Sequence, residues 1–412
     1  MLLCTKIRLQ VREADAEALE FMQGKCRGLY NWRVMRLREG ERWLGWAEAK
    51  ATLEASKEHD PELRFVYSKL LQEVYFRLEK AMVDFFRRVK AGGDGKPGFP
   101  RVRPRHAFFT LCYPAMYVKV EGDRLSLPTG GGGKTGIPKR FPNLVVRLTE
   151  PAPADYREVA ISRDARGHYY ASFVAEQPDE KRRTNDGVVA LDLGIKTLTT
   201  GVNERGRIYH IGGFKGHQWY NRQLDTIRSK RDRCQKKSRR YIHLSQVYQR
   251  VSERKRNKQR DCLHKASHLI AHRLVESTVV IGDLSQRQMV TKAHQQKYAQ
   301  NRRRLHRAVF NDWGLYRFVQ MLDYKCLRFG KDPHRIDERY TSQDCSRCGQ
   351  RQPMPLWKRT YRCGNPNCRL VMDRDENSAV NIRERFLARL GPHTSADAAC
   401  GVLHGSAVIN TF

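Results

Sequence analysis

The sequence predicts a multidomain α+β protein, in which a small β-barrel with a helical lobe precedes an α/β domain. Three patterns predict this architecture. An alternating segment at the start is separated from a later β-rich region by a long stretch with helical periodicity. Three consecutive short strands then precede an alternation of helices and strands. Two cysteine pairs near the end indicate a small metal-binding insert within the α/β domain.

The barrel and its lobe occupy the first part of the chain. Residues 1–12 are predicted to contain the first barrel strand, because apolar and polar residues alternate in "KIRLQV". Residues 13–95 are predicted to form the helical lobe and residues 96–182 the rest of the barrel, including a hairpin that turns at Asp164–Gly167. The glycine-rich "PTGGGGKTGIPKR" lacks the spacing of a phosphate-binding P-loop.

The clearest helix of the lobe is predicted over residues 67–90, where apolar residues recur every three or four positions. This stripe is expected in the core: Leu70, Leu71, Val74, Tyr75, Leu78, Ala81, Met82, Phe85 and Phe86. The opposite face could contact nucleic acid or simply be solvated, and it carries Lys69, Gln72, Arg77, Lys80, Arg87 and Arg88.

The α/β domain is predicted to be RNase H-like, with residues 183–340 as its first part and 371–390 as its last part. Residues 341–370 are the insert, and residues 391–412 are expected to be a flexible tail. A polar stretch at 285–305 is a hypothetical lid, from its position alone. Strands are expected at about 188–193, 197–203 and 207–212, in "TVVIG" and near "HRID". A helix is expected to contain Trp313, Leu315, Phe318, Val319, Leu322 and Cys326.

Composition indicates a polyanionic partner. The 412 residues carry 78 Lys+Arg against 44 Asp+Glu, a formal charge of +34, so phosphate binding should be strong and salt-sensitive. A ribosomal-type or merely soluble basic protein is the plainer alternative. The chain has 11 cysteines, no apolar run near the ~20 residues of a membrane span, and no signal-peptide core. These features predict a nucleic-acid binder in a reduced cytoplasmic compartment, with no membrane partner.

The cysteine pairs are the strongest local motif. Cys345 and Cys348 form one knuckle, and Cys363 and Cys368 form a second, wider one. Four thiolates suit tetrahedral zinc with no open position, so the motif predicts one structural Zn²⁺. Basic residues cluster around it, which favours a surface that faces nucleic acid: Arg347, Lys358, Arg359, Arg362 and Arg369.

Two acids stand out in addition to the cysteines. Asp192 lies among apolar residues in "VVALDLG", where a carboxylate is costly unless it is paired or bound to metal. Asp375 precedes Asn377 at the start of a helix, where it could be a metal ligand or only a helix cap.

In this order, "LDLGIKTLTT", "YTSQDCSRCG", the second knuckle and "DRDENSAVNI" resemble the TnpB family of transposon-encoded RNA-guided DNA nucleases, from which the type V CRISPR effectors descend. The likeness extends upstream through "LQEVYFRLEKAMVDFFRR", "GKPGFPR" and "GDRLSLP", so it covers roughly residues 1–385. The resemblance implies a wedge-type barrel, a helical recognition lobe, a RuvC nuclease domain and a zinc-ribbon insert that binds target nucleic acid.

The resemblance also implies three catalytic acids that hold two Mg²⁺ ions. The first and third map onto Asp192 and Asp375, with Asp373 a weaker match than Asp375. The family usually has a glutamate where this chain has Gly282, and the next residue, Asp283, should point to the other face of the sheet.

Glu338, in "HRIDERYTSQ", follows the neighbouring strand and fits a position where some family members carry the acid instead. Asp337 should point away by the same alternation. We therefore expect Glu338 to replace the missing acid, although it could be an ordinary surface glutamate near Arg339.

The basic helical region 228–260 contains 14 Lys/Arg against Asp232 and Glu253. In the family the corresponding helices line the channel for the RNA–DNA heteroduplex, which is bound through its phosphates. Expected contacts, besides Lys69, Gln72 and Arg77 of the lobe, are Lys230, Arg231, Lys236, Lys237, Arg239, Arg240, Arg254, Lys255, Arg256 and Lys258.

Three hypotheses for function follow. The first is an RNA-guided DNA endonuclease, active with guide RNA on double-stranded target DNA that bears a short flanking motif. It would act as a ribonucleoprotein monomer, a dimer being left open, at the nucleoid of a bacterial or archaeal cell. The second is a nuclease-dead RNA-guided DNA-binding protein, as Gly282 would indicate. The third is a DNA-binding transposase that acts without RNA.

Overall fold

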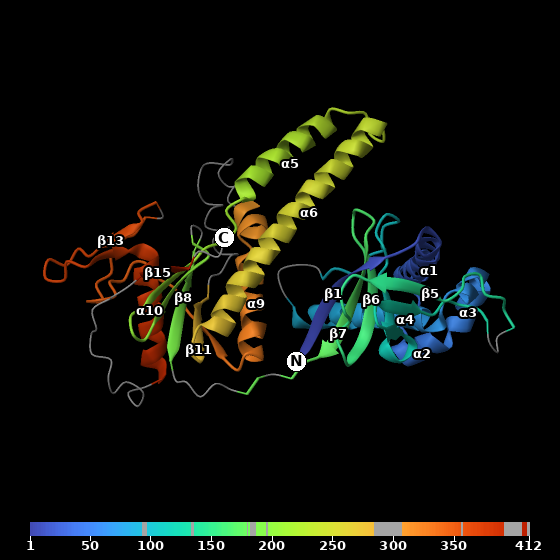
Figure 1. Cartoon of the computed structure of the whole chain (residues 1–412), viewed down its shortest axis with the longest axis horizontal. Coiled ribbons are helices and arrows are strands. Elements are labelled where there is room, and N and C mark those ends of the chain that lie inside the picture. Colours follow the sequence, from blue (N-terminus) through green and yellow to red (C-terminus); the bar gives the residue numbers. More distant parts are fainter. Residues whose placement is uncertain are drawn as a thin grey trace. The chain divides into compact units, whose positions relative to one another are not determined.

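The computed structural model describes residues 1–92, 97–132, 136–178, 180–181, 187–194, 197–283, 307–355, 357–390 and 406–409. The chain divides into two compact units, Met1–Gln177 and Pro178–Phe412 (Figure 1). The predicted polar lid at 285–305 lies outside the described residues.

A seven-stranded antiparallel sheet forms the frame of the first unit, in the order β2-β6-β7-β1-β5-β4-β3. The predicted hairpin is confirmed: β6 and β7 are joined by a turn in which Gly167 adopts φ +87° and donates its N–H to Asp164 O at 3.1 Å. The strands are β1 (Leu2–Gln10), β2 (Leu111–Pro114), β3 (Lys119–Glu121), β4 (Arg124–Leu127), β5 (Leu144–Leu148), β6 (Tyr156–Arg163) and β7 (Tyr169–Glu176).

This sheet is strongly curled. β2 and β3 are its two opposite edges, yet only the short helical turn η2 (Ala115–Tyr117) and Val118 separate them along the chain. From Pro114 to Lys119 the backbone reaches at most about 18 Å, whereas seven flat strands would place the edges about 29 Å apart. The edges must therefore approach each other, although no ladder joins β2 to β3 among the described residues.

The helices of the first unit pack on this sheet. α1 and α4 lie between β1 and β2 in the chain, so the predicted helical insertion is confirmed. Most of the predicted apolar stripe of α4 is buried, but Phe86 is 47% exposed and lies outside the core. The helices are α1 (Glu13–Arg38), α2 (Trp46–Ala51), α3 (Leu53–His59), η1 (Pro61–Phe65) and α4 (Ser68–Ala91).

A six-stranded mixed sheet forms the second unit, in the order β12-β11-β8-β9-β10-β15. β8, β9 and β10 pair antiparallel, whereas β11 and β12 add in parallel on the other side of β8, as the predicted strand pattern requires. The strands are β8 (Val188–Leu193), β9 (Thr199–Asn203), β10 (Ile208–Ile211), β11 (Thr278–Gly282), β12 (Asp332–Ile336) and β15 (Ser406–Ile409).

Helices cover both faces of this sheet (Figure 1). Odd-numbered residues of β8, such as Val189 and Leu191, pack against α6 and α9, whereas Val188 and Ala190 pack against α10. This alternation places Asp192 on the α10 face. The helices are α5 (His217–Asp232), α6 (Arg239–His268), the π-helical turns η4 (Leu269–Arg273) and η5 (Ala308–Trp313), α9 (Leu315–Arg328) and α10 (Arg374–Leu390).

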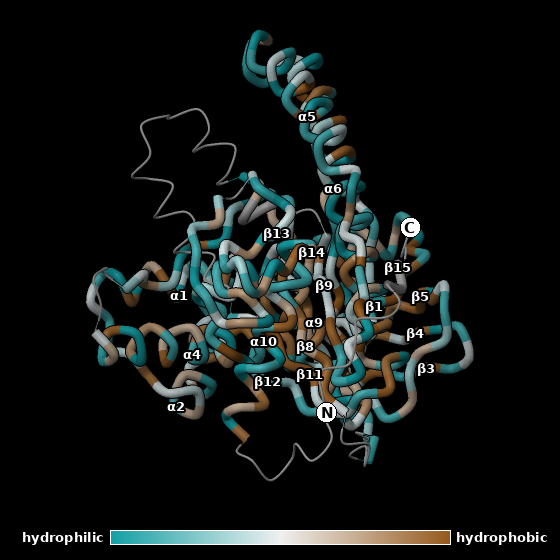
Figure 2. The backbone as a smooth tube through the Cα atoms, turned by 90° about the vertical axis from the view of Figure 1, so that its left-hand side faces the viewer, coloured by the Kyte–Doolittle hydropathy of each residue, from teal (hydrophilic) through white to brown (hydrophobic). Residues whose placement is uncertain are grey.

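Two smaller features complete the second unit. α5 and α6 form a helical hairpin whose far end projects beyond the sheet and is mostly hydrophilic (Figure 2). β13 (Thr360–Arg362) and β14 (Val371–Asp373) pair antiparallel, and α10 begins directly after β14.

The predicted flexible tail, 391–412, requires one correction. Residues 406–409 form β15, parallel to β10 at the edge of the sheet, and the rest of the tail lies outside the described residues. Among the described residues no helix has an apolar stretch long enough to cross a membrane.

Candidate functional site

Asp192 lies at the end of β8, on the sheet face that α10 covers. Its Oδ1 accepts a hydrogen bond from Ser378 Oγ of α10 at 2.8 Å. Burial raises the pKa of Asp192 well above its usual value; the Ser378 bond opposes this rise, and the nearby Glu338 and Asp375 add to it. Asp192 is therefore close enough to both other carboxylates for their charges to oppose its ionisation.

Glu338 follows β12 and lies over Gly282, the last residue of β11. A Cβ atom at position 282 would lie 2.6 Å from Glu338 Oε2 and 3.3 Å from Glu338 Cβ, closer than side chains pack. The glutamate side chain thus fills the space that a side chain at position 282 would need.

The Glu338 carboxyl group lacks a full set of hydrogen bonds. Its Oε2 is buried and has no partner among the described residues. Burial, together with the nearby charges of Asp283 and Asp337, raises the pKa of Glu338 to about 7. A buried oxygen without a partner is costly and needs an explanation, and a bound cation is one.

Asp375 occupies the first turn of α10. Its backbone N–H donates to Asp373 Oδ1 at 2.8 Å. Asp373, the weaker of the two candidates for the third acid, therefore caps the helix. Asp375 Oδ2 lies 3.7 Å from the point where a Cβ of Gly194 would stand, just beyond β8. The Arg359 guanidinium is 3.7 Å from Asp375 Oδ1.

The three acids thus converge at one edge of the sheet, because β8, β11 and β12 are parallel and end together beneath the start of α10. Their oxygens are more widely spaced than a closed single-ion cage, since they do not all lie within 4.8 Å of one another. Carboxylate oxygens are the ligands that Mg²⁺ prefers, and two-ion sites need separated ligands. The carboxylate donors are therefore of the chemical type that suits divalent cations.

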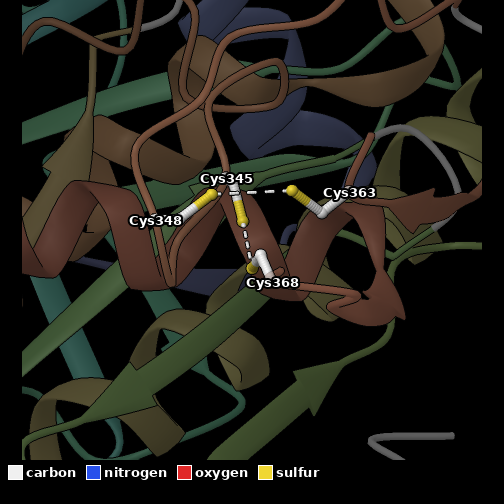
Figure 3. Close-up of side chains that lie close together, drawn as sticks. All are labelled: Cys345, Cys348, Cys363 and Cys368. Carbon is white, nitrogen blue, oxygen red and sulfur yellow. Dashed lines mark hydrogen bonds between the residues drawn. The ribbon is translucent and has the colours of Figure 1, made fainter. Parts of the chain in front are cut away.

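The four predicted cysteines do form a cluster (Figure 3). Their Sγ atoms all lie within 4.8 Å of one another, and the pairs Cys345–Cys368 and Cys348–Cys363 are each 3.6 Å apart. Tetrahedral zinc with Zn–S distances of about 2.3 Å needs sulfurs about 3.8 Å apart. The cluster is the one group of three or more such ligands in the part of the chain that the structure describes.

Two family models match the chain in these regions. Residues 172–293 match OrfB_IS605, described as "Probable transposase", and residues 316–382 match "Cas12f1-like, TNB domain". A Streptomyces pristinaespiralis protein named "Putative RNA-guided DNA endonuclease" is 28% identical over 93% of this chain and 89% of its own length. A TnpB-like protein of Methanocaldococcus jannaschii is 27% identical over 65% of this chain and 92% of its own.

The predicted resemblance to the TnpB family is confirmed. A solved Cas12f1–sgRNA–target DNA complex has the same general fold, with a TM-score of 0.58, 12% identity, and coverage of 90% of this chain and 83% of the solved one. In this TnpB-like chain the first matched segment contains Asp192 and Gly282, and the second contains Glu338, the cysteines and Asp375.

The α5–α6 hairpin carries most of the predicted phosphate contacts of the TnpB-like chain. Eight of them are exposed: Lys230, Lys236, Lys237, Arg239, Arg240, Arg254, Arg256 and Lys258. Arg231 is partly buried, bonded to Asp232 and packed over the rings of Tyr241 and Tyr248.

The structure differs from the predicted phosphate contacts at Lys255. This lysine is 7% exposed, is paired with Asp312, and donates to Asn221 Oδ1 at 2.7 Å, so its ammonium group is not available to phosphate. Of the lobe residues, Arg77 is half-buried and its guanidinium donates to Thr110 O and Cys112 Sγ, whereas Lys69 and Gln72 are hydrogen-bonded to each other at 3.2 Å.

Sequence patterns missed the polar residues that surround the acids. Ser378 contacts Asp192, and Glu376 Oε1 lies 2.9 Å from His210 Nε2 on the same face of the sheet. The signal that could have found them is the polar run "DENS" at the start of a helix that must pack on a sheet, where buried polar groups need partners.

Proposed function

We propose that this chain is an RNA-guided DNA endonuclease whose catalytic acids are Asp192, Glu338 and Asp375. The observation that carries the proposal is the position of Glu338, whose side chain fills the space over Gly282 and ends in a buried oxygen without a hydrogen-bond partner among the described residues. The name of the Streptomyces pristinaespiralis relative supports the same activity.

The three carboxylates would hold two Mg²⁺ ions. Bound there, the ions would supply stabilisation of the attacking and leaving oxygens in phosphodiester hydrolysis. Glu338 would be a ligand of these ions. Its pKa is raised to about 7 because its buried negative charge has no positive charge beside it, and a bound cation would supply that charge. The RuvC-type, RNase H-like character of this domain belongs to the same proposal and is supported by its strand order.

One Zn²⁺ on Cys345, Cys348, Cys363 and Cys368 would be structural, because four thiolates leave no open coordination position. The ion would fix a zinc ribbon built on β13 and β14, which leads straight into α10 and Asp375.

The proposed partners are guide RNA and double-stranded target DNA with a short flanking motif. The protein would bind them as a monomeric ribonucleoprotein. The exposed lysines and arginines of the α5–α6 hairpin suit the phosphates of an RNA–DNA duplex. The solved Cas12f1 relative, which is a complex with guide RNA and target DNA, supports this assignment.

A second candidate is a guided DNA-binding protein without nuclease activity. Gly282 favours it, because the family's usual glutamate is missing there. Glu338 opposes it, because a chain without catalysis has no need for a buried carboxylate beside two others.

The test begins with RNA that copurifies with the protein, which is sequenced to define a matched DNA target. Cleavage in Mg²⁺ is then compared for the wild type, Glu338→Ala, Gly282→Glu and the double variant Gly282→Glu/Glu338→Ala. We expect Glu338→Ala to abolish cleavage and the double variant to restore part of it, because the acid returns to an adjacent position in a space now free.

The matched control is Asp337→Ala, which removes an exposed acid one residue away and should cleave like the wild type. Wild-type cleavage by Glu338→Ala would refute the assignment of Glu338. Guided binding without any cut by the wild type would favour the second candidate. Binding that survives RNase treatment would favour a transposase that acts without RNA.

A further inference from the structure

We propose that Ser378 is a positioning residue for Asp192, and that Thr341 connects it to the backbone of Glu338. This inference rests on the proposed function, since it concerns how the acids are held for divalent cations. It is carried by a row of hydrogen bonds that joins β8, α10 and the segment after β12.

Ser378 lies between two of these elements. It is 3% exposed, and its Oγ is 2.8 Å from both Asp192 Oδ1 and Thr341 Oγ1. A hydroxyl group has one proton, and an ionised carboxylate only accepts. With Asp192 ionised, Ser378 therefore donates to Asp192 and accepts from Thr341, which fixes the direction of the carboxylate plane.

Thr341 fixes the backbone of Glu338. It is 3% exposed, and its N–H donates to Glu338 O at 3.2 Å; its Oγ1 also lies 2.8 Å from that carbonyl, so its single hydroxyl proton is shared between Glu338 O and Ser378 Oγ. The turn after β12 is thereby closed, so the position of Glu338 depends on the same threonine that contacts Ser378.

α10 holds this segment rigidly. Asn377, which is fully buried, and Asn381 both donate to Thr341 O and Asp344 O, at distances between 2.7 and 3.3 Å. Asn377 Oδ1 also accepts the N–H of Ser346, beside Cys345, at 3.0 Å. The helix that carries Asp375 therefore sets the positions of Asp192 and Glu338 as well.

A buried serine could instead serve packing alone. Such a residue would need one hydrogen-bond partner, which a helical serine commonly finds in the carbonyl one turn earlier. Ser267 of α6, which is fully buried, makes this bond to Leu263 O at 2.7 Å and also accepts from Lys325 Nζ at 2.8 Å, away from the three acids. Ser378 differs in that its hydrogen-bond partners, Asp192 and Thr341, are side chains of the acid site and of the segment that carries Glu338.

The experiment measures cation affinity separately from cleavage. Binding of Mn²⁺, a paramagnetic substitute for Mg²⁺, is followed by electron paramagnetic resonance on the guide-RNA complex without DNA, and the Mg²⁺ dependence of cleavage is recorded in parallel. Loss of a residue that orients a metal ligand weakens affinity roughly 10- to 100-fold. We expect Ser378→Ala and Thr341→Val to weaken Mn²⁺ binding at least about tenfold.

Ser378→Thr and Thr341→Ser keep the hydroxyl groups and should retain most of the affinity. Ser267→Ala, which removes an equally buried hydroxyl on the other side of the sheet, should lower thermal stability without changing Mn²⁺ affinity.

Wild-type Mn²⁺ affinity in folded Ser378→Ala would overturn the inference. If Ser378→Ala fails to fold, the comparison of Thr341→Val with Thr341→Ser decides it in the same way. Failure of the proposed function looks different: the wild type itself would neither bind Mn²⁺ through these acids nor lose cleavage on Glu338→Ala.

Discussion

At position 282 the absence of a side chain leaves the space that Glu338 occupies. Position 282 requires glycine because a larger side chain would clash with Glu338. Backbone conformation does not require it, because the φ of Gly282 does not lie in the left-handed region. The two residues are therefore coupled, and a change at either one is felt at the other.

Gly282→Ala should therefore impair cleavage much more than it impairs folding. A methyl group 2.6 Å from Glu338 Oε2 must displace the carboxylate, and a misplacement of about 1 Å can lower a rate about 100-fold. Overpacking should lower the free energy of unfolding by only about 1–3 kcal/mol. Single-turnover cleavage rates and urea unfolding of both proteins measure the two effects.

The control for this prediction is Gly28→Ala in α1. A Cβ at that exposed helical position meets nothing within 4 Å, so the variant should gain about 0.5–1 kcal/mol of stability and cleave normally. If Gly282→Ala cleaved as fast as the wild type, Glu338 would not need its present position.

At the scale of elements, two buried lysines fasten the end of α6 and the turn η4 to the segment that follows. Lys325 Nζ of α9 donates to His264 O at 2.6 Å and Ser267 Oγ at 2.8 Å. Lys331 Nζ donates to Ile270 O and Leu274 O at 3.1 and 2.6 Å. Both cations thus bind carbonyl groups near a helix C-terminus, where the helix dipole favours positive charge.

Lys325 predicts an unusual dependence of stability on pH. Burial lowers the pKa of Lys325 from 10.5 to about 8, so between these values the unfolded chain binds the proton that the folded chain has released. The free energy of unfolding should therefore rise with pH between about 8 and 10.5, by at most about 3 kcal/mol. Urea unfolding at pH 7.5 to 10.5 measures it, and Lys325→Met should lack the rise.

Lys265→Met provides the comparison, because this lysine is exposed on α6, the helix whose end Lys325 of α9 contacts. Its unfolding free energy should depend on pH as that of the wild type does. A rise that persisted in Lys325→Met would assign the effect to another group.

Most elements could be predicted because they follow short-range periodicity. Residues 188–193 form β8 with the predicted bounds, and the predicted helix 67–90 differs from α4 by one residue at each end. Lys255 shows the limit of such patterns. Its charge is buried by Asp312, 57 residues later in the chain, and no local period contains that pairing.

The candidate site likewise contains residues that sequence motifs identify and residues that they do not. Asp192, Asp375 and the four cysteines could be found from motifs, because their residue types and spacing are rare in combination. Ser378 and Thr341 could not, since hydroxyl groups near helix starts and turns are common, and only the packing of α10 on the sheet brings them to the acids.

At the scale of the whole molecule, the charge of +34 is concentrated in part on the α5–α6 hairpin. Exposed lysines and arginines there should bind nucleic acid with a steep dependence on salt, because each neutralised phosphate releases counterions.

Replacement of Lys236, Lys237, Arg239 and Arg240 by glutamine should flatten that dependence. If each contacts one phosphate, the slope of log association constant against log salt should fall by about 3. Filter binding of guide RNA and of an RNA–DNA duplex between 50 and 300 mM salt, roughly the range where such slopes are linear, measures it. Lys255→Gln should leave the slope unchanged, since its ammonium group is buried. An unchanged slope in the fourfold variant would move the binding surface elsewhere.

The first unit holds one continuous apolar core. Residues of β1, α1 and α4 and of the curled sheet, such as Ile7, Leu19, Leu71 and Phe173, belong to the same cluster of buried side chains. The helical lobe that the sequence delimits at 13–95 is therefore no detachable module. Attempts to shorten the protein by excising that lobe would strip the sheet of its packing, so a shortened chain has to keep the lobe and the sheet together.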